Sequence, residues 1–143
     1  MARSRVFLTK SEQSGERSVY DICGAEFFTA LVDAFYDGIE TDQVLIPLYP
    51  EGAHTKGARY RLATFLVQYW GGPHTYMEER GHPRLRMRHQ PFVITERERD
   101  HWLMHMAHAI ESTMEMIPEE SREDVVDQLA QYMVNAAEHL RNN

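Results

Sequence analysis

The sequence predicts an all-α protein. Apolar residues recur at steps of three and four over several long stretches, the pattern of a helix with one buried face. No alternating β-branched run is long enough to indicate a strand, and no internal repeat is present. Prolines and a glycine pair separate the helical stretches. A chain of 143 residues suits one domain with a single core.

The first half contains two predicted helices. The first is expected over residues 24–39, where seven apolar residues share one face. The segment "TDQVLIPLYPEG", residues 41–52, contains two prolines and is expected to connect elements without regular structure. A second helix is expected over residues 57–70, and "GGP" at 71–73 ends it.

Two longer helices are predicted in the second half. Thr95 and Glu98 form a T-x-x-E capping box, which is typical of the start of a helix. Pro118 ends this helix and suits the first turn of the next one. The buried face of the last helix is expected to run from Val125 to Leu140.

The amino end predicts a flexible extension over residues 1–19, followed by one domain over residues 20–143. No signal-peptide pattern occurs, and no apolar run approaches the roughly 18 residues needed to cross a bilayer. We therefore expect a cytoplasmic protein without stable membrane insertion. Cys23 is the only cysteine, which excludes an internal disulfide and a multi-thiolate metal site.

The charge balance excludes general nucleic-acid binding, because the net charge is −7 and such binding needs a basic face. The basic residues are 13 Arg and only 2 Lys. An arginine offers a planar fork that suits carboxylates. An arginine cluster could therefore bind an anion although the whole chain is acidic.

Three histidines in "HWLMHMAH" raise the question of a metal site. His101, His105 and His108 fall at i, i+4 and i+7, a spacing that could place ligands around zinc. They point away from the apolar face of the same helix. We therefore expect a solvated face, with a surface-bound metal as the alternative.

Several aromatic residues carry polar groups on apolar faces. Tyr36, Tyr49 and Trp102 would each need a hydrogen-bond partner if buried. They could find backbone carbonyls in a core, or they could surround a cavity that binds a polar ligand.

The stretch "RGHPRLRMRHQPF", residues 80–92, concentrates four arginines and two histidines. His82 precedes Pro83 and is expected to be extended. His89 ends a short helical run, and the carbonyl of Leu85, four residues earlier, can accept its Nδ1–H. This would direct the Nε2 lone pair outward, so His89 is the better metal ligand, although a structural or surface role is the alternative.

These features together resemble the group II, or O-type, truncated haemoglobins of actinobacterial character. The resemblance runs from about Tyr20 to Ala137, and its most specific block is "QYWGGPHTYMEERGHPRLRMRHQPF", residues 68–92. Three shorter motifs match the family at suitable spacing: "FY" at 35–36 and "YPE" at 49–51, which form the pattern "FY…YPE", and "ERDHW" at 98–102.

The resemblance implies a truncated globin fold, a two-over-two helical sandwich around haem b (iron protoporphyrin IX). It implies that His89 is the proximal iron ligand and that Tyr36, Tyr49 and Trp102 are distal hydrogen-bond donors to the iron's ligand. Arg61, and after it Arg86, would pair with the haem propionates. The remaining implied haem contacts are Ala58, Leu62, Leu85 and Phe92.

The implied function is reversible, high-affinity binding of O₂, and of NO and CO, at ferrous iron, with oxygen transport as a family role. One alternative is a haem-dependent redox enzyme, an NO dioxygenase or a peroxidase, that needs an external reductase. The other is a haem-free helical interaction domain. A homodimer is compatible with the acidic surface.

Overall fold

The computed structural model describes residues 17–143, and in this range the chain is helical and contains no β-strand, which confirms the all-α prediction. Residues 1–16 of the predicted extension lie outside the described residues. Near its end, Ser18 caps the first helix and Val19 is the first residue of that helix. The elements, in chain order, are α2 (Val19–Ile39), η2 (Ile46–Leu48), α3 (Lys56–Tyr69), α4 (Thr75–Arg80), α5 (Leu85–His89), α6 (Glu96–Thr113), η3 (Met114–Met116) and α7 (Glu119–Leu140).

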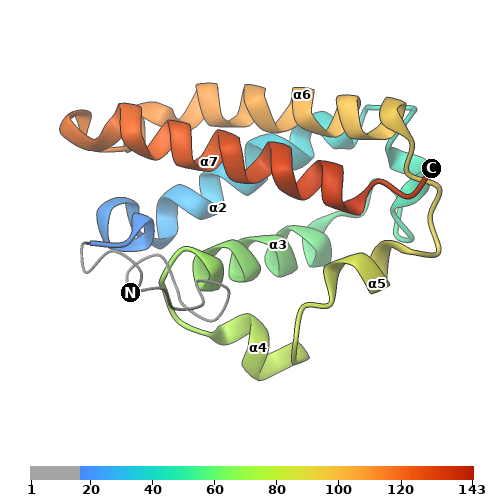
Figure 1. Ribbon diagram of the computed structural model, residues 1–143, viewed down its shortest axis with the longest axis horizontal. Helices are drawn as coiled ribbons and strands as arrows, with labels where there is room; N and C mark the ends of the chain where they lie inside the picture. The colour runs from blue at the N-terminus through green and yellow to red at the C-terminus, as the bar shows by residue number, and fades with distance from the viewer. Residues whose placement is uncertain (1–16) are drawn as a thin grey trace, which may run out of the picture.

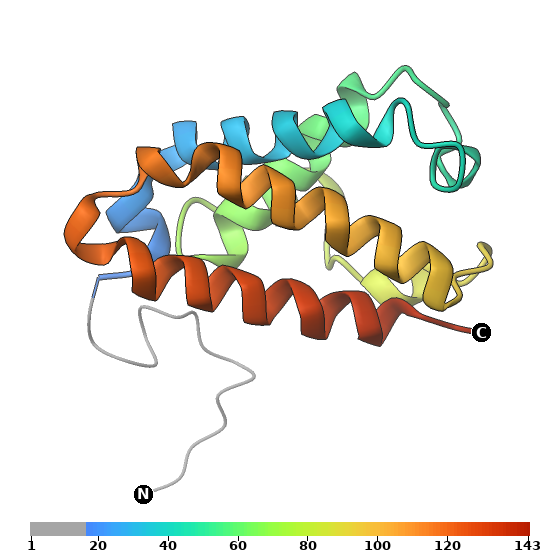
Figure 2. The same cartoon turned by 90° about the horizontal axis from the view of Figure 1, so that it is seen from above.

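The long helices form two pairs (Figure 1). Helix α2 packs against both α3 and α6, and α6 packs against α7. Figure 2 shows α6 and α7 side by side, with α3 crossing beneath α2. This is the two-over-two arrangement that the family resemblance implies.

The core lies where these helices meet, and α2 contributes the largest share of its buried residues. The predicted apolar face of this helix is confirmed, because each of its seven residues is at most 5% exposed. The seven are Phe27, Phe28, Leu31, Val32, Phe35, Tyr36 and Ile39. Burial of these side chains is the main force that holds α2 against α3 and α6.

Helix α2 begins five residues before its predicted start. Ser18 and Asp21 form a reciprocal capping box, so the helix starts at Val19. Gly24 then adopts a left-handed φ of 81°, which joins two helical pieces across a kink. The first piece was not predicted from the sequence, because Gly24 interrupts the apolar spacing.

The second half of the chain follows the predictions closely. The capping box of Thr95 and Glu98 is present and starts α6. Pro118 is the N-cap of α7, one position before the first turn in which it was expected. The short helix α4 was not predicted, because six residues are too few to show a periodic pattern.

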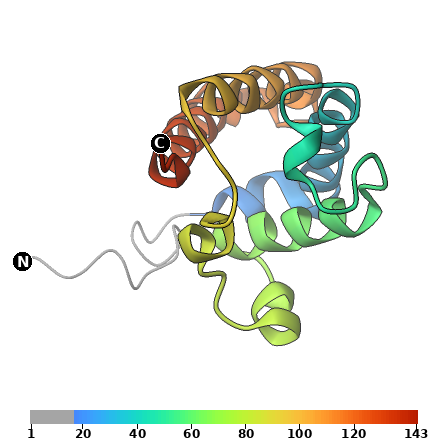
Figure 3. The ribbon, with the colours of Figure 1, turned by 90° about the vertical axis from the view of Figure 1, so that its right-hand side faces the viewer.

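One end of the sandwich is enclosed by non-helical chain. In Figure 3, α6 and α7 lie above α2 and α3, the segment after α2 lies at one side, and α5 with the segment leading to α6 lies at the other. No helix in residues 17–143 is both long and apolar enough to span a membrane.

Candidate functional site

A cavity of about 390 Å³ opens at this end of the sandwich. Its wall combines apolar side chains with a histidine, two aromatic donors, four arginines and one carboxylate. The lining residues are Leu45, Leu48, Tyr49, Pro50, Arg61, Arg80, Arg88, His89, Phe92, Ile94, Glu98, Arg99, Trp102, Ala137 and Leu140. Segments far apart in the sequence therefore meet around one space.

His89 lies on the cavity wall at the end of α5. Its Nδ1 donates to the carbonyl oxygen of Leu85 at 2.6 Å, which is the contact predicted from their spacing. This hydrogen bond fixes the tautomer and leaves Nε2 as the lone-pair nitrogen. His82 does not line the cavity, and its Nδ1 accepts from the backbone N–H of Arg84 at 3.1 Å.

Four arginines face the cavity: Arg61, Arg80, Arg88 and Arg99. Only Arg61 was among the predicted site residues. The Nε of Arg88 is buried and has no hydrogen-bond partner among the described residues. A buried, unpartnered guanidinium N–H is unfavourable, so this wall is suited to a bound anion.

Arg86 lies elsewhere. Its Nη1 donates to the carbonyl oxygen of His139 near the end of α7, at 2.5 Å, and it does not line the cavity. Leu85 also lies outside the cavity wall and lines a separate groove beside α7.

The predicted aromatic donors lie together, in two layers. Tyr49 and Trp102 line the cavity, whereas Tyr36 lies behind Tyr49 and is 5% exposed. The Tyr36 and Tyr49 rings meet edge to face, with their centroids 5.7 Å apart. Burial raises the pKa of Tyr36 to about 12 and that of Tyr49 well above its ordinary value. Both phenols therefore keep their protons at neutral pH.

Of the predicted apolar contacts, Phe92 lines the cavity. Ala58 and Leu62 lie on α3, pack partly buried against the core, and are not part of the cavity wall.

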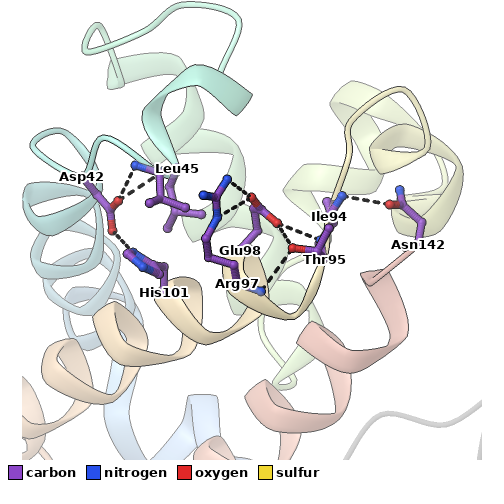
Figure 4. Close-up of polar contacts among 9 residues, drawn as sticks. Asp42, Leu45, Ile94, Thr95, Arg97, Glu98, His101 and Asn142 are labelled. Carbon is purple, nitrogen blue, oxygen red and sulfur yellow. Dashed lines mark hydrogen bonds and ion pairs between the residues drawn. The ribbon is translucent and has the colours of Figure 1, made fainter.

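The expectation of a solvated histidine face is wrong for two of the three residues. The Nδ1 of His101 and the Nε2 of His105 both donate to Oδ2 of Asp42, at 2.9 and 2.6 Å (Figure 4 shows His101). Only His108 is exposed. The described residues contain no cluster suited to a separate metal ion. The sequence could not show this, because Asp42 lies about sixty positions away.

The carboxylate of Glu98 belongs to the start of α6. It accepts hydrogen bonds from the hydroxyl and the backbone N–H of Thr95, which lower its pKa to about 2 (Figure 4). The neighbouring Ile94 N–H donates to the Asn142 side chain at 2.8 Å, which ties the cavity rim to the end of the chain. The Glu98 carboxylate therefore acts as part of the capping box of α6.

The donor set fits haem. His89 offers an imidazole nitrogen, the arginines offer charge to two propionates, and the leucines, Phe92 and Ile94 offer an apolar wall. An imidazole with its second nitrogen hydrogen-bonded to a carbonyl is the usual form of a haem-iron ligand.

Comparisons with known proteins agree with this fit. The family model described as "Bacterial-like globin" matches residues 18–135. The chain is 40% identical over 122 residues to the group 2 truncated hemoglobin YjbI of Bacillus subtilis (strain 168), covering 83% of this chain and 89% of that relative.

Solved structures give the same result. The thermostable hemoglobin of the actinobacterium Thermobifida fusca is 46% identical with a TM-score of 0.80, and the match covers 88% of this chain and 98% of that one. The truncated oxygen-avid haemoglobin of Bacillus subtilis is 33% identical with a TM-score of 0.77, covering 88% and 100%. The chain thus belongs to the bacterial-like globins and is a group II truncated haemoglobin, a haem-binding globin with an oxygen-related function.

Proposed function

We propose that the chain binds haem b in this cavity through His89 and uses it to hold O₂ with high affinity. The observation that carries the proposal is that His89, oriented by Leu85, shares one cavity with the donors Tyr49 and Trp102. The histidine and Tyr49 come from segments at opposite sides of that end of the molecule (Figure 3).

The arginines would hold the propionates. Arg61, Arg80 and Arg88 place planar, permanently charged forks on the wall, and such forks pair well with carboxylates. Arg99 also lines the wall, but its guanidinium is paired with Asp100 and Glu138. Arg88 carries the strongest support, since its buried Nε has no partner among the described residues. Arg86 is not part of the proposed site, because it does not line the cavity and its guanidinium donates to the His139 carbonyl.

Haem, when bound, supplies the iron that takes up O₂, NO or CO. The O–H of Tyr49 and the N–H of Trp102 would donate to a diatomic ligand in the cavity and stabilise negative charge on it. The Tyr36 ring packs edge to face against the Tyr49 ring and supports its position. In an apolar surrounding such donors act strongly, so release of O₂ should be slow. The oxygen-avid relative from Bacillus subtilis supports this expectation.

Slow release would make the protein a poor oxygen carrier. We therefore keep a second candidate, a haem-dependent NO dioxygenase or peroxidase whose activity needs an external reductase. It predicts turnover only when an electron donor is supplied.

Absorption spectroscopy tests the proposal. The purified, reduced protein should show a Soret band and a stable oxygenated spectrum in air. His89→Ala should weaken or shift this band, whereas His82→Ala, a histidine of the same stretch outside the cavity, should not. If haemin added to the wild-type protein gives no band, the proposal is wrong and the alternative of a haem-free interaction domain returns.

A further inference from the structure

The distal wall of the cavity depends on a segment with little structure of its own. Between α2 and α3 the chain has only the 3-10 turn η2, yet it supplies Leu45, Leu48, Tyr49 and Pro50 to the wall. The position of Tyr49 relative to Trp102, on α6, is therefore set by whatever fixes this segment.

Asp42 makes the connection. Its Oδ1 accepts from the backbone N–H groups of Val44 at 2.8 Å and Leu45 at 3.2 Å, which closes the turn that leads into η2. Its Oδ2 accepts from the side chains of His101 and His105 on α6. Figure 4 shows the carboxylate between the Leu45 backbone and the His101 ring.

These two histidine contacts are the only hydrogen bonds between residues 41–50 and α6 in the part of the chain that the structure describes. The Asp42 side chain is 7% exposed, so water screens them little. His101 directly precedes Trp102 in the chain. One carboxylate thus joins the backbone that carries Tyr49 to the helix turn that carries Trp102.

Close packing supports the same connection from α2. A Cβ on Gly38 would lie 2.4 Å from Nδ1 of His105, so only a glycine lets this ring reach Asp42 along its present path. Burial alone would raise the pKa of Asp42, but the hydrogen bonds from the two histidines and the two backbone amides hold it well below its ordinary value. The carboxylate therefore stays ionised and remains an acceptor for all four donors.

We propose that Asp42 is a positioning residue for ligand retention: by holding the Tyr49 segment against His101 and His105, it fixes the distance between the two distal donors. The inference rests on the proposed function for its kinetic consequence, but its structural part does not require haem. Without Asp42 the segment keeps its apolar contacts and remains folded, while Tyr49 moves more freely relative to Trp102.

Two variants separate the two oxygens. Asp42→Ala removes both sets of contacts. Asp42→Asn keeps an oxygen for the Val44 and Leu45 amides but replaces the charged acceptor of His101 and His105 with an N–H₂ group, so chiefly the connection to α6 is weakened. Asp127→Ala, at an exposed position on α7, is the matched control.

Hydrogen exchange tests the structural part. In both Asp42 variants the backbone amides of Ile46, Leu48 and Tyr49 should exchange about tenfold faster than in wild type, the equivalent of one lost hydrogen-bonded contact. Asp127→Ala should leave them unchanged. Faster exchange confined to Val44 and Leu45 would mean that Asp42 only closes its own turn, and the proposal would be overturned.

Stopped-flow measurement of O₂ release tests the functional part. Asp42→Ala and Asp42→Asn should release O₂ about five- to tenfold faster than wild type. In a Tyr49→Phe background the same substitutions should add less than about twofold, because the donor they position is already gone. Additive effects, or unchanged release from the Asp42 variants, would reject the positioning role. If wild type itself releases O₂ rapidly, the proposed function fails, while the exchange result still decides the structural connection.

Discussion

At the scale of single residues, the two tryptophans have different surroundings. Trp102 lines the cavity. Trp70 is fully buried, and its ring packs against Tyr69 and Tyr132. Only the first can donate to a ligand, so the pair offers a matched comparison.

Trp102→Phe should speed O₂ release by about tenfold or more, since the lost hydrogen bond is equivalent to about 1.4 kcal/mol. Trp70→Phe should change the release rate by less than about twofold. Flash photolysis or stopped-flow mixing measures both. Equal rates in Trp102→Phe and wild type would remove Trp102 from the set of distal donors.

Arg88 and Arg86 provide a second comparison, two positions apart on α5. Arg88→Met should speed transfer of haem to an excess of apomyoglobin by about tenfold, because it removes a charged partner of a propionate. Arg86→Met should change transfer by less than about twofold, because Arg86 contacts the His139 carbonyl. The opposite order would exchange the roles of the two arginines.

The sequence could predict local contacts of the site but not which arginine faces the cavity. The bond between His89 and Leu85 follows from one helical turn. Arg86 and Arg88 are separated by about 200° around the helix, so they face opposite ways. Which one faces inward depends on how α5 leaves Arg84, whose left-handed φ of 47° is unusual for a residue other than glycine.

At the scale of elements, α2 and α6 approach each other closely at Gly38, where the His105 ring leaves no room for a Cβ. Gly38→Ala should lower the free energy of unfolding by about 1–3 kcal/mol, because the new methyl group meets the His105 ring. In a His105→Ala background the same change should cost less than about 0.5 kcal/mol. Urea unfolding of the four proteins measures this. Equal losses in both backgrounds would show that the glycine matters for backbone reasons alone.

The buried face of a helix could be predicted from its own sequence, whereas the contact between Gly38 and His105 could not. Apolar periodicity within α2 identified its buried side, because the helical repeat alone decides which of its residues share a face. The approach of Gly38 to His105 depends on how two helices cross, and one sequence contains no signal for it. The same holds for Asp42, whose partners lie on another helix.

At the scale of the whole molecule, an acidic chain places four of its 13 arginines around one cavity and holds two buried carboxylates, Asp42 and Glu98, at the same end. Asp42 and Glu98 are 7% and 8% exposed at their side chains, and hydrogen bonds lower the pKa of each. Asp42 joins the segment after α2 to α6, and Glu98 completes the capping box at the start of α6. The stability of the molecule should therefore depend on their ionisation.

Acid should consequently destabilise the protein over a defined range. The pKa of Glu98 is about 2 in the folded chain and near 4.5 when it is free of contacts, so the unfolded chain binds more protons between these values. The free energy of unfolding should fall as the pH drops from about 5 to about 2, and the contribution should be complete above about pH 5. Glu98→Gln should flatten this dependence, whereas Glu123→Gln, at an exposed position on α7, should leave it unchanged. Urea unfolding at pH 7, 5, 4 and 3 compares the three proteins under identical conditions. A Glu98→Gln curve parallel to wild type would show that the carboxylate is not the group that links acid to unfolding.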